Sequence, residues 1–125
     1  KLKIFLFIIF CSLLINGVGR TYQYEQQVAS VYPEKLIATV YAYSSEKHQT
    51  DSTPFITASN QKVREGIVAN NCLPFGTFVK IADRIFQVED RMNKRYDCTV
   101  FDIWHEATED AKKWGKQLLE VEIIK

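Results

Sequence analysis

Two aspartates lie beside runs of apolar residues, where a carboxyl group could exchange protons near neutral pH. Asp90 follows the alternating segment 85–89, and Asp102 lies inside the apolar segment 100–104. A carboxyl group buried among such side chains has its pKa raised by desolvation, and a second carboxylate nearby raises it further. These are the properties of a general acid. Spacing alone, however, favours a simpler interpretation of Asp102, as an outward-facing strand residue or a turn-capping carboxylate.

Metal-ligating and nucleophilic side chains are few. His48 and His105 are far apart and no CxxC or HxxxH spacing occurs, so we predict neither a metal site nor a cofactor. Cys72 and Cys98 are the only cysteines after Cys11. In an oxidising compartment they would either pair in a disulfide or remain two buried thiols, and their positions alone leave both alternatives open.

Length and charge limit the classes of protein to consider. The chain of 125 residues suffices for one folded domain, and 16 Lys and Arg against 15 Asp and Glu leave a net charge of +1. Nucleic-acid binding usually needs a large basic field, so we expect no nucleic-acid partner. With 46% apolar and 13% aromatic residues, the body of the chain is expected to be globular. We also expect a monomer.

Residues 1–19 have the pattern of an export signal. Two lysines precede an apolar run over residues 4–15, and two glycines offer small residues before a cut ahead of Arg20. A permanent N-terminal anchor is the alternative, although a spanning helix needs roughly 20 apolar residues. We therefore expect an extracytoplasmic protein, secreted or in the cell envelope, that meets a membrane only through this segment. Residues 20–35 are polar and Gln-rich and predict a linker.

The rest of the chain, residues 36–125, predicts one mainly β domain. β-Branched and aromatic residues are concentrated in short segments bounded by Gly, Pro, Asn or charged residues, which is typical of strands. Asp83 and Arg84 predict a tight hairpin turn between two of them. The expected strands are 36–43, 66–69, 78–81, 85–89, 99–104 and 118–125.

One helix and one long loop complete this domain. Residues 107–114 predict the helix, because Ala107, Ala111 and Trp114 share one face and a glycine follows as a natural C-cap. Residues 44–54 are polar and predict a surface loop of the kind that often carries function. This loop is a candidate to line a substrate site.

Five short segments occur in an order that is quite specific when they are taken together. In this order they resemble the three-aspartate (3D) domain, over residues 38–124. The resemblance implies a six-stranded double-psi β-barrel with one short helix near the C-terminus. It also implies an enzyme acting on peptidoglycan, because the family forms the catalytic core of MltA-type lytic transglycosylases and of small relatives of the YuiC type. The segments are Leu-Pro-Phe-Gly-Thr at 73–77, Val-Glu-Asp-Arg-Met-Asn at 88–93, Phe-Asp-Ile-Trp at 101–104, Glu-Asp-Ala-Lys-Lys-Trp-Gly at 109–115 and Val-Glu-Ile-Ile at 121–124.

The resemblance assigns roles to the two aspartates. Asp102 falls on the family's catalytic aspartate and Asp90 on a supporting carboxylate. The implied reaction cleaves the bond from N-acetylmuramic acid to N-acetylglucosamine in glycan strands without water, and it leaves a 1,6-anhydro product. One carboxyl group can donate a proton to the leaving oxygen and then take one from the 6-hydroxyl group, so the carboxylate pair of glycoside hydrolases is not required.

Further side chains are expected to contact the glycan. Three aromatic residues could stack on sugar rings or pack in the core: Tyr41, Tyr43 and Trp104. Core packing is favoured for the tyrosines, because alternation sends both to the same side of the strand. Both alternatives stay open for Trp104. Asp51 could supply another carboxylate, although a cap on its own loop is the favoured interpretation. The other expected substrate contacts are Thr57, Asn71 and Asn93.

Two segments depart from the family's pattern. The family's first aspartate lies in an Ala-Val-Asp-Pro segment, where residues 67–72 here read Ile-Val-Ala-Asn-Asn-Cys. Asn70 or Asn71 would hold that place as a hydrogen-bonding group without charge. The Gly-Gly that commonly follows the second aspartate is replaced by Arg-Met-Asn-Lys-Arg-Tyr at 91–96. The chain therefore resembles a divergent subgroup.

Three other functions stay open. A barrel that lacks one family aspartate could bind peptidoglycan or another carbohydrate without cutting it. Asp102 and Asp90 could instead act as the pair of a water-using glycosidase, which would release reducing ends. The third alternative is a structural part of an envelope or virion, which only the polar linker favours.

Overall fold

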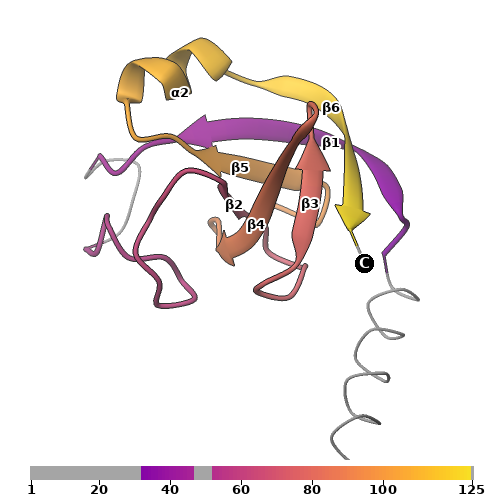
Figure 1. Ribbon diagram of the computed structural model, residues 1–125, viewed down its shortest axis with the longest axis horizontal. Coiled ribbons are helices and arrows are strands. Elements are labelled where there is room, and N and C mark those ends of the chain that lie inside the picture. The colour runs from indigo at the N-terminus through magenta and orange to yellow at the C-terminus, as the bar shows by residue number, and fades with distance from the viewer. Residues whose placement is uncertain (1–31, 47–51, 125) are drawn as a thin grey trace, which may run out of the picture. The chain divides into compact units, whose positions relative to one another are not determined.

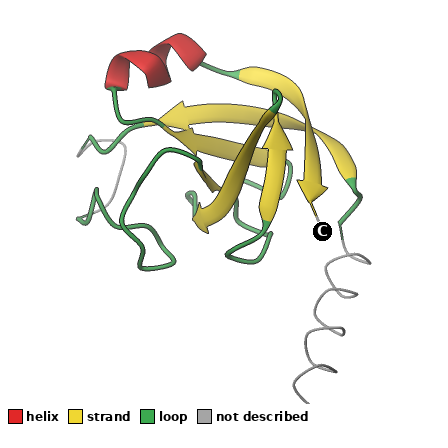
Figure 2. Cartoon of the chain, in the orientation of Figure 1, coloured by secondary structure: helices red, strands yellow, loops and turns green. Residues whose placement is uncertain are grey.

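Six strands and one helix follow one another along the part of the chain that the computed structural model describes, residues 32–46 and 52–124 (Figures 1 and 2). The predicted signal segment and residues 20–31 of the predicted linker lie outside these residues, and so does Asp51. The compact unit that holds every strand begins at Glu34. The elements are β1 (Lys35–Tyr43), β2 (Ile67–Ala69), β3 (Phe78–Ile81), β4 (Arg84–Asp90), β5 (Val100–Trp104), α2 (Thr108–Trp114) and β6 (Gln117–Ile124).

The strands close into a barrel in the order β1-β5-β2-β4-β3-β6. The pairs β1·β5 and β2·β4 are parallel, and the other four neighbouring pairs are antiparallel. Parallel neighbours need long connections, and here these connections carry the loops that surround one end of the barrel. The prediction of a mainly β chain, a six-stranded double-psi β-barrel with one short helix near the C-terminus, is confirmed.

Strand alternation produces the core. In β6, Val121 and Ile123 point inward while Glu120 and Glu122 lie on the other face, as the sequence period predicts. Cross-strand neighbours of the inward residues come from β3 and are equally apolar. Burial of these side chains supplies the main favourable term for folding. The fully buried apolar side chains are Val40, Ile67, Val68, Leu73, Val79, Ile81, Phe86, Val88, Phe101, Ile103 and Val121.

The β3–β4 hairpin turns one residue earlier than predicted. Ala82 and Asp83 have φ values of 47° and 64°, the left-handed conformation that a two-residue hairpin loop of type I′ requires at both positions. Arg84 is already paired with Ile81 and belongs to β4. The turn is therefore Ala82–Asp83 and not Asp83–Arg84.

The predicted helix and its end are present. Ala111 is buried, and the indole Nε1 of Trp114 donates a hydrogen bond to the carbonyl oxygen of Val40 at 3.4 Å, which attaches α2 to β1. Gly115 has a φ of 64° and its N–H donates to the Ala111 carbonyl at 3.1 Å, so the glycine ends the helix as a C-cap. No helix in residues 32–46 or 52–124 is long and apolar enough to cross a membrane.

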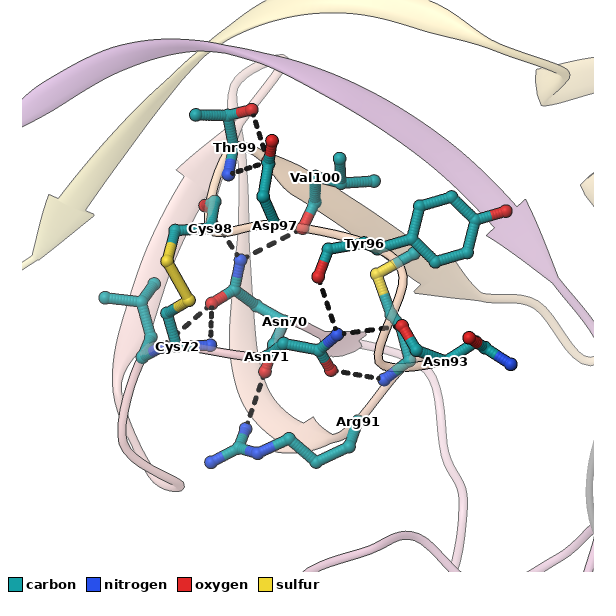
Figure 3. Close-up of a disulfide and its surroundings, with 12 residues drawn as sticks. Asn70, Asn71, Cys72, Arg91, Asn93, Tyr96, Asp97, Cys98, Thr99 and Val100 are labelled. Carbon is teal, nitrogen blue, oxygen red and sulfur yellow. Dashed lines mark hydrogen bonds between the residues drawn. A yellow bond between two sulfur atoms is a disulfide. The ribbon is translucent and has the colours of Figure 1, made fainter.

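Cys72 and Cys98 are joined in a disulfide with their Cα atoms 5.2 Å apart (Figure 3). Of the two alternatives that the sequence left open, the structure thus has the paired one. The bond connects the loop after β2 to the turn before β5. Cys98 directly follows the residue 91–97 loop, so the bond fixes the end of that loop.

Removal of this disulfide is expected to destabilise the fold substantially. The two cysteines are 26 residues apart, and cross-linking a loop of that length lowers the entropy of the unfolded chain by an amount equivalent to about 3–4 kcal/mol. The double variant Cys72→Ala/Cys98→Ala should lose about that much free energy of unfolding, measured by urea denaturation at equilibrium. An unchanged midpoint and slope would show that the cross-link contributes nothing to stability.

Candidate active site

A short β-bulge brings the two aspartates next to each other. Ala69 of β2 pairs with Asp102 of β5 on one side and with Asp90 of β4 on the other. The register of β2 with β4 shifts between Val68 and Ala69, so that Ala69 faces Asp90 and not Glu89. Neighbouring strands lie about 4.8 Å apart, and a bulge redirects the side chains that follow it. Asp90 and Asp102 therefore flank one small residue on the same wall of the barrel.

Hydrogen bonds hold the Asp90 carboxylate in one orientation. Tyr43 Oη donates to Oδ2 at 2.6 Å, and the backbone N–H groups of Ala58 and Arg91 donate to Oδ1 at 2.9 and 2.8 Å. Burial raises the pKa of the Tyr43 phenol, and the charge of Asp90 raises it further, so the phenol stays protonated as a donor. Asp90 is thus held by Tyr43 of β1, by Ala58 of the loop 53–63 and by the N–H of the next residue, Arg91.

The surroundings of Asp102 differ from those of Asp90. It is half-buried in β5, and its Oδ1 atom is buried without a hydrogen-bond partner among the described residues. Desolvation raises the pKa of this carboxyl group to about 7, and the negative charge of Asp90 adds to the shift. Asp102 can therefore hold and release a proton near neutral pH, which general acid–base catalysis requires.

Both aspartates line a groove of about 730 Å³. One side of the groove is formed by the end of β1 and by β2 and β5, and the other by the loop 53–63 and the loop that follows β4. The volume is in the range of sites that hold a small ligand or a few sugar units. The lining residues are Tyr41, Ala42, Tyr43, Thr53, Pro54, Ile56, Thr57, Ala58, Val63, Ala69, Asp90, Arg91, Met92, Asn93, Arg95, Tyr96 and Asp102.

Thr57 and Asn93, two of the predicted contacts, line this groove, and so do Tyr41 and Tyr43, for which core packing was the favoured prediction. Tyr41 is half-buried and its ring faces Tyr96, with the ring centroids 6.0 Å apart. Thr57 is buried, and its hydroxyl group exchanges hydrogen bonds with the backbone of Gln61, so it mainly shapes the loop. Asn93 is exposed, and its Oδ1 accepts the N–H of Arg95 at 3.1 Å.

The structure corrects the role expected for Asn71. Its Nδ2 atom donates to the carbonyl oxygens of Asn93 and Tyr96, both at 3.0 Å, and its Oδ1 accepts the N–H of Met92 at 2.8 Å (Figure 3). The side chain does not line the groove. Because all three bonds go to backbone atoms of one loop, Asn71 positions that loop.

Asn70 likewise lies away from the groove. Its side chain is 0% exposed, and Nδ2 donates to the carbonyl oxygens of Cys98 and Val100 at 3.2 and 3.0 Å. Oδ1 accepts the N–H groups of Cys72 and Leu73 at 2.9 and 2.8 Å (Figure 3). These four bonds use both donors and both acceptor positions of an amide, whereas a carboxylate could not donate. Neither asparagine therefore supplies a third polar group beside Asp102.

Trp104 belongs to the core. It is 6% exposed, packs with Tyr43 and Ile67, and donates a hydrogen bond from Nε1 to Ser45 Oγ at 3.1 Å. Of the two alternatives that the sequence left open for Trp104, the structure has core packing. Tyr43 is also buried, but its hydroxyl group reaches the site through Asp90.

Sequence reasoning missed the residues that form the far wall of the groove. Arg91, Met92, Arg95 and Tyr96 all line it. In this segment only Asn93 was predicted to contact a substrate. The signal that could have identified the other residues is their position directly after Asp90, because a loop that follows a strand end with a candidate site residue borders the site.

No protein-family model matches the sequence, and comparison with curated proteins gives no significant match. The function of the chain must therefore be argued from the geometry of this groove and from the motifs already described.

Substitution of Asp102 by asparagine should stabilise the protein at pH 8. The folded-state pKa of about 7 lies above the unfolded value of about 3.9, so the native state is destabilised by this group as the pH rises between those values. Asp102→Asn removes the cost of a desolvated carboxylate and should raise the free energy of unfolding on the order of 2–4 kcal/mol at pH 8 and far less at pH 4.

Urea denaturation at both pH values measures the difference. Asp83→Asn is the matched control, because the Asp83 side chain is 94% exposed and should give the same small change at pH 4 and pH 8. If Asp102→Asn were no more stable than the unsubstituted protein at pH 8, desolvation of this carboxyl group would be refuted.

Asn70→Asp should destabilise the fold, most strongly above pH 5. The new carboxylate would face the two carbonyl oxygens that Nδ2 now binds, and the expected loss is about 2–4 kcal/mol at pH 7. At pH 4 the loss should be smaller, since a protonated carboxyl group can donate to one of those carbonyls. Asn60→Asp, on an exposed loop residue, is the control for urea denaturation. Equal stability of Asn70→Asp and the unsubstituted protein would contradict the amide requirement.

Proposed function

We propose that this chain is an exported lytic transglycosylase that cleaves peptidoglycan glycan strands, with Asp102 as its catalytic residue. The observation that carries the proposal is a half-buried carboxyl group with a pKa of about 7, lining a groove of about 730 Å³ beside a second, anchored carboxylate. The ordered resemblance to the 3D domain and the closed six-stranded barrel both agree with it.

The reaction needs only one residue that can both give and take a proton. Protonated Asp102 donates to the glycosidic oxygen as the bond from C1 of N-acetylmuramic acid to that oxygen breaks. The resulting carboxylate accepts the proton of the sugar's own 6-hydroxyl group, whose oxygen closes on C1. Asp102 ends the cycle protonated, and no water is consumed. A pKa near the working pH makes both forms accessible in one turnover.

The positions of the two aspartates favour this reaction over hydrolysis. A water-using glycosidase places its two carboxyl groups on opposite sides of the scissile bond. Asp90 and Asp102 instead flank Ala69 on one wall, and Asp90 already accepts three hydrogen bonds. Asp90 is therefore assigned a supporting role: its charge helps to retain the proton on Asp102.

An extracytoplasmic location is part of the proposal. The signal-like residues 1–19 favour export, and the disulfide between Cys72 and Cys98 favours an oxidising compartment. Peptidoglycan is accessible in that compartment. Tyr41, half-buried in the groove, is the aromatic residue proposed to contact a sugar ring.

Incubation of the purified full chain with peptidoglycan should release muropeptides with 1,6-anhydro ends, identified by mass spectrometry. Asp102→Asn should lower the rate by about 100-fold or more, the usual size of a general acid–base contribution. Asp83→Asn, remote from the groove, should cleave at the unsubstituted rate.

Other products would identify the competing functions. Reducing ends in place of anhydro ends would indicate hydrolysis by Asp102 and Asp90. Binding of the chain to insoluble peptidoglycan without any soluble product would indicate a carbohydrate-binding module. Either result would overturn the proposed activity.

A further inference from the structure

The loop after β4 carries a cation that is held against an aromatic ring at the edge of the groove. The guanidinium carbon of Arg95 lies 4.9 Å from the ring centroid of Tyr96, and its Nη2 atom donates to Tyr96 Oη at 3.1 Å. Both side chains line the groove. Stacking on a ring restrains the plane of a guanidinium group and leaves its other N–H groups free to donate.

A second cation lies beside the same aromatic pair. The Tyr96 ring is 6.0 Å from the Tyr41 ring, and Lys116 Nζ lies 5.8 Å from the centroid of Tyr41. Within residues 32–46 and 52–124, neither Arg95 nor Lys116 forms an ion pair with a carboxylate. The two positive charges on this rim are therefore available to an anion from outside the chain.

Arg91 also lines the groove, but its guanidinium group is engaged by other residues of the chain. Its guanidinium group lies 3.7 Å from the centroid of the Phe75 ring, and Nη1 donates to the carbonyl oxygens of Asn70 and Asp90 at 2.7 and 3.3 Å. Arg91 supports the backbone of the site. This contrast assigns the recognition of an anion to Arg95 and Lys116.

The rim is held in place by the network behind it. The amide of Asn71 binds the carbonyl oxygen of Tyr96, and the disulfide fixes Cys98 two residues later (Figure 3). The Asp97 carboxylate accepts the backbone N–H of Thr99 at 2.9 Å, which fixes the turn between them. Such support reduces the entropy that is lost when a ligand binds.

We propose that Arg95, Tyr96 and Lys116 form a subsite for a carboxylate substituent of the glycan. This inference rests on the proposed function and specifies its substrate: N-acetylmuramic acid carries a lactyl ether that ends in a carboxylate or in an acidic peptide, whereas N-acetylglucosamine carries neither. Arginine recognises carboxylates through paired N–H donors. The charge of Asp90 repels the anion from the base of the groove, so the charges orient the sugar with its acidic substituent at the rim.

Binding to the full chain carrying Asp102→Asn tests the subsite without cleavage. Calorimetric titration would use three tetrasaccharide probes: a neutral N-acetylglucosamine oligomer, alternating N-acetylglucosamine and N-acetylmuramic acid with free lactyl carboxylates, and the same oligomer bearing peptides. We expect an acidic probe to bind more tightly than the neutral one. Arg95→Ala should weaken that acidic probe about fivefold and the neutral probe less than twofold.

Two further variants separate local contact from general effects. Lys94→Ala removes the same charge one residue away, outside the groove lining, and should change neither affinity. Arg95→Gln can keep a contact with Tyr96 Oη but lacks the charge, and it should match Arg95→Ala. If Arg95→Ala weakens binding of the oligomer with free lactyl carboxylates, the lactyl group is the source of the carboxylate. If it weakens binding of the peptide-bearing oligomer only, the peptide is the source.

The result that would overturn the subsite is equal weakening of neutral and acidic probes by Arg95→Ala, or equal affinity of all probes for the Asp102→Asn chain. Failure of the proposed activity would look different. In that case the chain would prefer acidic glycans while no anhydro product was formed by the unsubstituted protein.

Discussion

The pairing of Ala69 with an aspartate on each side is the constraint on which the site depends. A regular ladder would place Glu89 opposite Ala69, and the bulge in β2 and β4 places Asp90 there instead. Glu89 is buried and accepts a hydrogen bond from the hydroxyl group of Ser59, and Asp90 accepts one from the N–H of Ala58, so the two neighbouring carboxylates of β4 hold the same loop. The short side chain of Ala69 lets Asp90 act on Asp102 across one strand. Burial and that charge together place the pKa of Asp102 near neutrality.

The segments behind the site are arranged so that this pair is kept in position. Asn70 links the loop after β2 to the start of β5 through two hydrogen bonds to carbonyl oxygens and accepts two more from N–H groups of its own loop, and the disulfide joins the same two segments covalently. Asn71 then holds the loop that forms the far wall. An uncharged amide suits both positions, since each side chain must donate to carbonyl oxygens and accept from N–H groups at once. These bonds explain why asparagines and not aspartates occupy both positions.

Charge is divided within the groove. The carboxyl groups of Asp90 and Asp102 lie at the barrel wall, whereas Arg95 lies beside Tyr96 at the rim and Lys116 lies beside the ring of Tyr41. A net charge of +1 for the whole chain conceals this separation. Complementary potentials of this kind contribute to specificity more than to raw affinity, because they disfavour the wrong orientation of a ligand.

The sequence by itself determined the elements of the fold. Dense β-branched segments predicted the strands, and the Ala107–Gly115 spacing predicted the helix and its end. Apolar neighbours drew attention to Asp102, but spacing alone favoured an outward-facing or turn-capping residue; burial in the folded barrel is what raises the pKa of its carboxyl group. Alternation along one strand, however, does not say which strand lies next to it. Only the closed barrel decided that Asp90 meets Asp102, that Trp104 is buried beside Tyr43, that Asn70 and Asn71 turn away from the groove, and that Lys116 lies beside Tyr41. These contacts join residues far apart in the chain, and their register depends on strand pairing and on a bulge that no local pattern reveals.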